Sequence, residues 1–392
     1  MKTALVELGA VVVFNPPWPR QALSGMSHAA HVAYVTPEML FPDALEVEPE
    51  TACFGDCREG HHHFCHGDVL APGNFAALQA GACAQAVLTQ ASGFCPDRML
   101  VLRPDAQQLD ARYLLHFLRQ TRMRNFIAVH LQDSKRTFPH TREFLRQLKM
   151  PLPTLYQQQN WSRQLDHAFE LWRKWAREAK SRDTTRRLFF HNFFGTTSGM
   201  QQRWQAVELG RLLDKLIIGS ASLERYRAPH GDWLIRPGNL GCNRINMEDM
   251  LQVCLPAAGV RRNRVLAGDV LFSLLAGQHG QTAAAPAEIA PASIGAGVAI
   301  LRSAQLEPGF LAAYLSSGTG LGEIERVLAG LPGHDLTASA VRGMRLLLPP
   351  RAMQCEFVLA DRELEADCDA AWSRVAQFRK RFMQLEHEAF RG

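Results

Sequence analysis

The hydrophobic pattern becomes regular in two separate parts of the chain. In two stretches, Trp161 to Phe193 and Phe357 to Ala389, apolar residues recur at alternating steps of four and three, the spacing that paired helices bury between them. A stripe this apolar does not remain in water, and the simplest partner for each helix is the other one. The pattern predicts an antiparallel coiled coil whose seam includes Trp161, Leu165, Trp172, Trp175, Phe189, Leu364, Val375, Phe378, Phe382 and Leu385.

Polar residues interrupt this seam at Arg182, Arg186 and Asp361. If Trp161 lies opposite Ala389, then Asp361 falls about one helical turn from Arg186, and we expect these two side chains to pair. The alternative is that both charges extend to solvent along their aliphatic stems.

Ahead of each helix the pattern is mixed. Short apolar runs such as "HVAYV" and "DWLIR" are bounded by turn residues and predict strands, whereas "DARYLLHFLRQT" has the three-and-four spacing of a helix. "VELG" and "GDVL" each occur twice, both at an offset of 201, and "PLPTLYQQ" returns as "LLPPRAMQ" at an offset of 196. The chain is therefore predicted to be an internal duplication of the α+β class.

The duplication predicts four segments. Two α/β domains in tandem, residues 1–150 and 201–346, are each followed by a long helix, in residues 151–200 and 347–392. The glycine-rich "GTGLGEI" from Gly318 is interpreted as a loop joining helices. No phosphate loop, "HExxH" motif or dinucleotide fingerprint is present, so no cofactor is expected.

Taken together, these motifs resemble the specificity subunit of type I restriction-modification systems. Members of that family carry a "PLPPLxEQ" type phrase at a helix start, an "LG" start to each target recognition domain and a "GDVLF" strand within it. The doubled set "VELG", "GDVL" and "PLPTLYQQ"/"LLPPRAMQ" covers nearly the whole chain. One departure is Ala71, where the family has Phe after the first "GDVL".

The resemblance implies a function without chemistry of its own. Each target recognition domain would read one half of a bipartite sequence in double-stranded DNA, and the helix pair would set the gap between the half-sites. The helices would also dock two adenine methyltransferase subunits, which recruit the restriction subunits. A protein-interaction scaffold that does not read DNA remains the alternative.

Charge and composition narrow this picture only slightly. A net charge of +5 suits an acidic partner, although it is small for 392 residues. The sequence shows neither a signal peptide nor the roughly 18 uninterrupted apolar residues of a membrane helix, which favours a cytoplasmic protein with no membrane partner. Nine cysteines without regular spacing favour reduced thiols.

The candidate DNA contacts are arginine, lysine, asparagine, glutamine and histidine residues in polar and glycine-rich stretches. Arginine, glutamine and asparagine can bond base edges and phosphates. Solvated turn residues would give the same pattern. In the second domain the candidates are Arg227, Arg236, Asn239, Asn243, Arg244, Arg261, Arg262, Arg264, Gln278, His279 and Gln281. In the first domain Arg122, Arg124, Lys135 and Arg136 fit contact with the DNA backbone better than base reading.

The stretch "CFGDCREGHHHFCH" holds thiols and imidazoles, which zinc prefers. Its members Cys53, Cys57, His61, His63 and Cys65 match no standard zinc spacing, and the second copy has no histidines at the aligned positions. We therefore interpret it as a surface loop without a metal, with structural zinc as the alternative.

Overall fold

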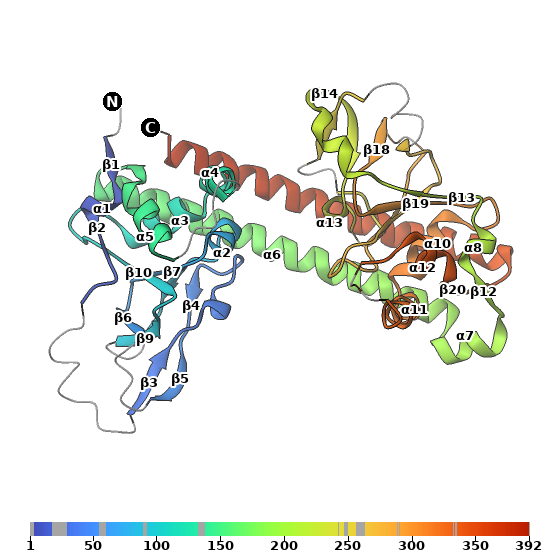
Figure 1. Ribbon diagram of the computed structural model, residues 1–392, viewed down its shortest axis with the longest axis horizontal. Helices are drawn as coiled ribbons and strands as arrows, with labels where there is room; N and C mark the ends of the chain where they lie inside the picture. Colours follow the sequence, from blue (N-terminus) through green and yellow to red (C-terminus); the bar gives the residue numbers. More distant parts are fainter. Residues whose placement is uncertain are drawn as a thin grey trace. The chain divides into compact units, whose positions relative to one another are not determined.

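A computed structural model describes residues 4–17, 30–54, 60–88, 92–131, 138–241, 243–246, 250–255, 263–287, 289, 291–331, 333 and 335–391. The chain forms two compact units (Figure 1). Unit 1 comprises residues 1–174 and 377–392, and unit 2 comprises residues 175–376. Two long helices, α6 (Leu155–Phe194) and α13 (Arg351–Ala389), contribute one part to each unit.

Unit 1 is built on two sheets. The first has the order β2-β10-β7-β8-β4 and the second the order β5-β3-β9-β6. The strands of the first sheet are β2 (Val12–Phe14), β10 (Met99–Pro104), β7 (Val69–Pro72), β8 (Ala84–Ala86) and β4 (Glu46–Val47). Those of the second are β5 (Glu50–Phe54), β3 (Ala30–Tyr34), β9 (Ser92–Pro96) and β6 (His61–Cys65). The remaining elements are β1 (Leu5–Glu7), α1 (Leu8–Val11), η2 (Pro37–Met39), α2 (Phe75–Ala80), α3 (Ala111–Arg119), α4 (Thr121–Leu131), α5 (Phe138–Gln147) and β11 (Lys149–Pro151).

Unit 2 repeats this plan with a four-stranded sheet, β13-β19-β16-β17, and a three-stranded sheet, β15-β14-β18. Their strands are β13 (Lys215–Ile218), β19 (Val298–Arg302), β16 (Val270–Ser273), β17 (Thr282–Ala284), β15 (Leu251–Val253), β14 (Arg227–Ile235) and β18 (Ala292–Ile294). The remaining elements are α7 (Thr197–Arg203), β12 (Ala206–Glu208), α8 (Leu209–Leu212), η3 (Ala221–Tyr226), η4 (Pro237–Asn239), α10 (Pro308–Ser316), α11 (Gly318–Leu328), α12 (Ala338–Gly343) and β20 (Arg345–Leu347).

The strand pairing confirms the internal duplication. In unit 1, β3 runs parallel to β9 and antiparallel to β5, and in unit 2, β14 runs parallel to β18 and antiparallel to β15. The valine and glutamate of each "VELG" lie in a short strand paired with the strand that leads into the proline phrase, β1 with β11 and β12 with β20. The leucine and glycine of the motif begin the short helices α1 and α8. The glycine of the motif is needed for close packing, because a Cβ at Gly210 would lie 2.9 Å from Cβ of Arg342.

Both "GDVL" motifs form the same turn and the same ion pair. Gly67 and Gly268 have positive φ angles of 88° and 80°, which favour glycine. The aspartate that follows is buried and accepts two hydrogen bonds from an arginine. Arg103 Nε lies 2.8 Å from Asp68 Oδ1, and Arg302 Nε lies 2.6 Å from Asp269 Oδ1. Each pair ties the motif to the neighbouring strand of its sheet.

The repeated proline phrase positions a buried glutamine at the start of each long helix. Gln158 accepts a hydrogen bond from the Asp110 N–H at 2.8 Å and donates to the carbonyls of Gln108 and Pro153. Gln354 accepts from the Glu307 N–H at 3.0 Å and donates to the carbonyl of Pro349. The glutamine thereby fixes each helix to the loop before the nearest helix of its own unit, because buried backbone groups require partners.

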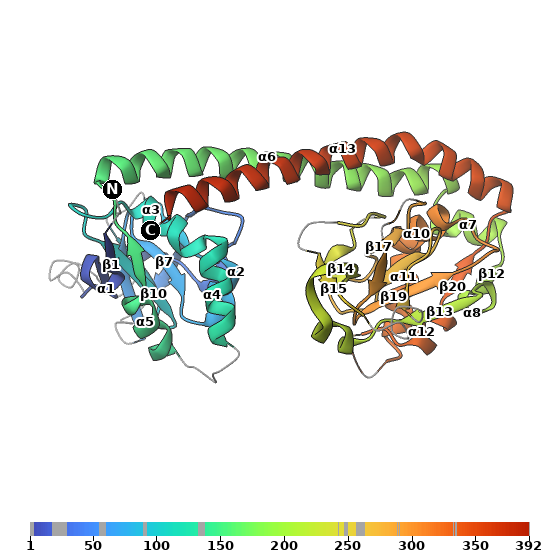
Figure 2. The ribbon, with the colours of Figure 1, turned by 90° about the horizontal axis from the view of Figure 1, so that it is seen from above.

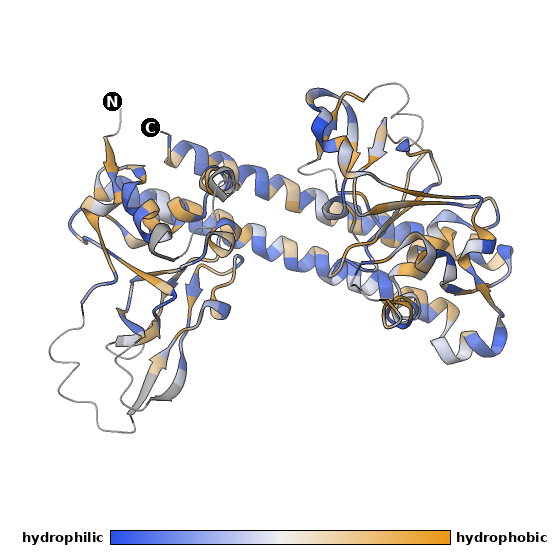
Figure 3. Ribbon diagram, in the orientation of Figure 1, coloured by the Kyte–Doolittle hydropathy of each residue, from blue (hydrophilic) through white to orange (hydrophobic). Residues whose placement is uncertain are grey.

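The two long helices lie side by side in each unit, antiparallel, as the hydrophobic pattern predicts (Figure 2). In unit 1, Trp172 stacks on Phe382, and in unit 2, Phe189 stacks on Phe357. The register agrees with the expected one to within about one turn. Hydropathy along both helices alternates between polar and apolar patches, as expected for a rod that buries only part of its surface (Figure 3).

The predicted pairing of Arg186 with Asp361 is confirmed. Both residues are buried, Arg186 Nε lies 2.9 Å from Asp361 Oδ1, and Arg186 Nη2 lies 2.5 Å from Asp361 Oδ2. Burial alone would lower the pKa of Arg186, but the hydrogen bonds and charge of Asp361 outweigh it and raise that pKa. The seam thus encloses a bidentate ion pair, and the solvent-exposed alternative does not apply.

One expectation about local structure is wrong. The stretch from Gly318 is a helix, α11, and not a loop, because the Ser317 side chain caps it by accepting a hydrogen bond from the Gly320 N–H. A serine cap at this position offsets the low helix propensity of the three glycines. Among the residues described here, no helix has the length and apolarity needed to cross a membrane.

Candidate nucleic-acid interface

A tight turn in unit 2 presents Arg244, one of the sequence-predicted DNA contacts. Leu240 bridges Ile245, and the Arg244 N–H donates to the Thr282 carbonyl at 3.1 Å. Asn243 has a φ of 51°, a left-handed conformation that asparagine tolerates. The Asn243 side chain accepts a hydrogen bond from the Ala284 N–H. The turn is therefore held firmly against β17.

From this turn Arg244 reaches the helix pair within the same unit. Its guanidinium carbon lies 4.3 Å from the ring centroid of Trp372 on α13, a cation–π distance. The Trp372 indole N–H in turn donates to Asp183 on α6, at 3.1 Å to Oδ2. Burial raises the pKa of Asp183, against the opposing effects of the Trp372 hydrogen bond and nearby arginines. The three side chains form a continuous link from the domain to both helices.

A polar pocket of about 410 Å³ surrounds this link. Lys180, Thr184 and Arg187 line it from α6, and Arg244 and Gln281 line it from the domain. The lining includes three cations, Lys180, Arg187 and Arg244, against the single carboxylate of Asp183. Such a pocket can attract a phosphate, while the Gln281 amide can bond a base edge.

The helix residues of this pocket were not among the predicted contacts. Asp183 and Thr184 each lie three or four residues from both Lys180 and Arg187, so the four residues share one face of α6. Their signal in the sequence is a polar face beside the seam. This face could have been predicted from the polar residues that recur three and four positions apart between the seam residues.

The other predicted residues of unit 2 have different surroundings. Asn239 and Asn243 are buried. The Asn239 side chain is bonded to backbone groups of Arg236 and Asn246, and that of Asn243 to the Ala284 N–H of β17, which argues against base contact by these two. Arg227 and Arg264 are exposed, on β14 and in a bridge to Ser293. Arg236, Gln278 and His279 are partly buried, and Arg261 and Arg262 lie outside the described residues.

In unit 1 the predicted backbone contacts are spread over α4 and a stretch outside the described residues. Arg122 is exposed, whereas Arg124 Nε donates to the Gln79 carbonyl at 2.7 Å. Lys135 and Arg136 lie outside the described residues. Neither Arg122 nor Arg124 lines the pocket of about 410 Å³, which belongs to unit 2.

The counterpart of this pocket in unit 1 is nearly filled. It has a volume of about 70 Å³, and Arg119, Phe169 and Phe382 are among its lining residues. The Arg119 guanidinium donates to the carbonyls of Pro42, Ala44 and Cys83, and burial lowers its pKa to about 10. Because its donors already have partners, we do not assign DNA contact to this pocket.

The interpretation of the histidine stretch as a surface loop is wrong. His61–Cys65 form strand β6, paired with β9, and His63 is buried with its ring at 5.7 Å from that of Phe94. His63 and Phe64 are both buried, whereas His61, His62 and Cys65 on the same strand are partly exposed. In unit 2 the bridge between Arg264 and Ser293 has the same place, so the histidine strand corresponds to the arginine cluster.

Metal ligation of this stretch has no support in the residues described. No group of three His, Cys, Asp or Glu side chains in that part of the chain could hold a metal ion. Cys57 lies outside the described residues, and the Cys53 side chain is likewise not described.

Comparison with known proteins gives a match in structure only. No family model and no curated protein matches the chain. A chain from a structure on complex assembly and conformational transition of the type I R-M system matches with a TM-score of 0.50 and 18% identity, covering 100% of this chain and 98% of that one. This chain has the fold of a type I specificity subunit.

Two further solved structures match over almost the whole chain. The HsdS subunit from Thermoanaerobacter tengcongensis has 19% identity and a TM-score of 0.40, covering 99% of this chain and 96% of that chain. The type I restriction-modification system S subunit from M. genitalium has 12% identity and a TM-score of 0.46, with the same coverages of 99% and 96%. The match at a TM-score of 0.50 confirms the family resemblance for the fold alone.

Proposed function

We propose that the protein is the DNA sequence-specificity subunit of a type I restriction-modification complex. Residues 1–150 and 201–346 each read one half of a bipartite target in double-stranded DNA. The segments 151–200 and 347–392 supply the paired helices. The protein itself is non-catalytic, and two adenine methyltransferase subunits, with restriction subunits bound through them, carry out the chemistry.

The observation that carries this proposal is the duplication itself. The same two-sheet domain occurs twice, each copy attached to a long helix through a buried glutamine, and the helices pair antiparallel. A duplicated unit suits a target in two halves and a pair of identical partners, because each copy can make the same kind of contact. The likeness to the type I R-M chain supports the same conclusion for the fold.

Within unit 2 the polar pocket supplies the chemistry for reading DNA. Lys180, Arg187 and Arg244 would bind phosphate oxygens, and Gln281 would bond a base. Exposed Arg227 and Arg264 extend this set, together with Arg261 and Arg262 of the same cluster. In unit 1, Arg122, Lys135 and Arg136 are the proposed backbone contacts.

The proposal is tested by DNA binding of the protein together with its methylating partners. Replacing Arg244 with Ala should weaken binding of the cognate duplex about tenfold and reduce the slope of log K against log salt by about one. Fluorescence anisotropy at several salt concentrations measures both. Arg211, an exposed arginine of the same unit that pairs with Glu208, provides the control, and its replacement with Ala should change neither value.

A second experiment distinguishes a subunit that reads DNA from a protein-interaction scaffold that does not. Mapping of methylated adenine in the host genome, with and without this gene, should show loss of one bipartite motif. A complex that binds duplex DNA with equal strength whether or not this chain is present would overturn the proposal in favour of a protein-interaction scaffold.

A further inference from the structure

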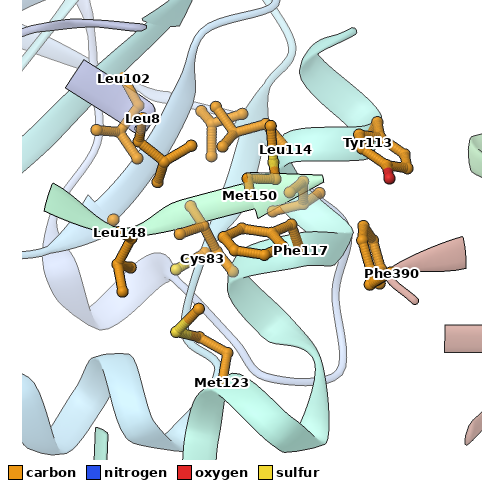
Figure 4. Packing of buried hydrophobic residues seen from close by; sticks show 14 of the residues in the cluster. Leu8, Cys83, Leu102, Tyr113, Leu114, Phe117, Met123, Leu148, Met150 and Phe390 are labelled. Atoms are coloured by element: carbon orange, nitrogen blue, oxygen red, sulfur yellow. The ribbon is translucent and has the colours of Figure 1, made fainter. Parts of the chain in front are cut away.

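An apolar groove of about 780 Å³ opens on the surface of unit 1. Its floor includes Phe117 of α3, Met123 of α4, Leu148 and Phe390, which lie close together in the core of the unit (Figure 4). Exposed apolar side chains stand at its edge, since 58% of Leu5 and 45% of Phe126 face solvent. The groove therefore exposes an apolar surface that the described residues of unit 1 do not cover.

The duplicated unit shows what covers the corresponding surface there. The duplication places Tyr314, Thr319 and Phe194 of unit 2 at the positions of Phe117, Arg122 and Phe390. Helix α7 lies on this surface. The hydroxyl oxygens of Thr197 and Thr319 are 2.8 Å apart, and the Thr319 hydroxyl lies 3.9 Å from Met200 Sδ.

Burial in unit 2 confirms that α7 seals this surface. Met200 of α7 is fully buried in the same cluster as Phe194 and Tyr314. Trp204, directly after α7, packs edge-on against Phe194 at 5.8 Å between ring centroids. A seven-residue helix with a single buried methionine, followed by an aromatic ring four residues after that methionine, is thus sufficient to cover the surface.

We propose that the groove of unit 1 binds a short amphipathic helix of the methylating subunit. This helix would insert an apolar side chain where Met200 lies in unit 2, between Phe117, Met123 and Phe390 of unit 1. The choice of partner rests on the proposed function, whereas the existence of a helix-binding groove rests on the comparison of the two units.

The charges at the groove edge define the chemistry of the partner helix. Arg122 and Lys149 are both exposed and both line the groove, whereas no acidic side chain does so among the described residues. In unit 2, Thr319 stands at the position of Arg122 and faces the uncharged Thr197. A helix with one or two carboxylates beside its apolar face therefore fits unit 1 better than α7 itself.

The groove is tested first without any partner subunit. The probe is a capped peptide of residues 195–205, "GTTSGMQQRWQ", and a version of it with Gln201 and Arg203 replaced by Glu. We expect the full-length protein to bind the acidic version at least fivefold more tightly than the original, by fluorescence anisotropy of the labelled peptides. Phe126→Ser should weaken binding at least tenfold, and Arg122→Glu should reverse the preference between the two peptides.

Phe41→Ser is the matched control, because 55% of Phe41 is exposed in the same unit and this residue does not line the groove. Leu5→Ser repeats the test at a second exposed apolar side chain of the groove, and because 58% of Leu5 is exposed, this substitution is not expected to unfold the protein. If both peptides bind the parent protein and the Phe126→Ser variant equally well, the groove does not bind a helix and the proposal is wrong.

The partner is tested in the assembled complex. A photo-crosslinking amino acid at position 126 should form a covalent product with a helical segment of the methylating subunit, and one at position 41 should not. A complex that assembles and binds DNA but gives no such product overturns this inference and leaves the proposed function intact. Failure of the complex to bind DNA overturns the proposed function instead.

Discussion

The two units share a scaffold and differ in the surfaces that it presents. Both hold a buried aspartate–arginine pair behind "GDVL" and a buried glutamine at the start of the long helix. In unit 2, however, the pocket beside the helices is open and cationic, whereas in unit 1 the guanidinium of Arg119 satisfies carbonyls in a nearly filled space. Scaffold contacts are thus retained in both copies, while contacts available to ligands have diverged.

The helix seam shows the same divergence in its interior. The duplication offset of 196 relates Arg186 to Phe382 and Asp361 to Leu165. Unit 2 therefore buries an ion pair where unit 1 buries two apolar side chains of the same core cluster. The residues at equivalent positions of unit 1 can therefore be installed in unit 2 to test whether an apolar pair can replace the ion pair.

Breaking the ion pair is expected to have the largest effect. Arg186→Met leaves Asp361 buried without its main partner and should lower the free energy of unfolding by about 3–5 kcal/mol. The double variant Arg186→Phe with Asp361→Leu installs the unit 1 residues and should recover stability to within about 1 kcal/mol of the parent, or exceed it. Urea unfolding followed by tryptophan fluorescence measures both changes.

Arg182→Met is the control, because it removes a seam arginine whose acidic partners are not buried. Its partners Glu178 and Asp367 are 37% and 57% exposed and remain solvated without it, so the cost should stay below about 1 kcal/mol. A double variant as unstable as Arg186→Met would show that the two seams are packed differently and that the apolar pair cannot replace the ion pair.

The buried glutamines are expected to have the next largest effect. Gln158→Leu leaves the Asp110 N–H and two carbonyls unpaired and should cost about 3 kcal/mol, whereas Gln354→Leu removes two hydrogen bonds and should cost about 2 kcal/mol. Thermal unfolding of the two variants measures the difference between the copies.

Gln157→Leu is the neighbouring control, because its side chain is exposed and bonds only to Thr154. Its cost should remain below about 1 kcal/mol. Equal stability of Gln158→Leu and Gln157→Leu would mean that the proline phrase does not fix the helix through its glutamine.

Features that repeat with a fixed period could be predicted from the sequence. The duplication, the long helices, their antiparallel pairing and the Arg186–Asp361 pair all follow from periodic positions, because a seam residue has one place in its helix. The buried positions Phe169, Phe190 and Phe194 were missed, since each helix also buries a second face against its own domain. A seven-residue pattern describes only the face toward the partner helix.

The candidate site was less predictable for a physical reason. Arg244 and Gln281 were identified because their residue types suit DNA, but Lys180 and Arg187 were not, because their proximity to Arg244 depends on tertiary packing. Similarly, the burial of Asn239 and of His63 depends on how turns and strands face the core. Local sequence indicates the kind of side chain and not the surface to which it contributes.

The smallest expected effect concerns Glu386, whose counterpart in unit 2 is the buried Phe190. Burial raises the pKa of Glu386 to about 7, although a hydrogen bond from Thr121 and the charge of Arg124 act in the opposite direction. Because the folded-state pKa lies above the ordinary value of 4.5, the protonated carboxyl stabilises the fold fully below about pH 4.5. That contribution is lost as the pH rises through 7.

Glu386→Gln mimics the protonated carboxyl and should therefore stabilise unit 1 by about 2 kcal/mol at pH 8 and hardly at all at pH 5. Differential scanning calorimetry at the two pH values measures this as a rise in Tm confined to the higher pH. Glu388, an exposed carboxylate on the same helix, supplies the control variant Glu388→Gln, which should show no such pH dependence. An equal rise in Tm at both pH values would mean that the Glu386 carboxyl does not titrate in this range. Unit 1 would then tolerate a charged carboxylate at the position where unit 2 buries the phenyl ring of Phe190.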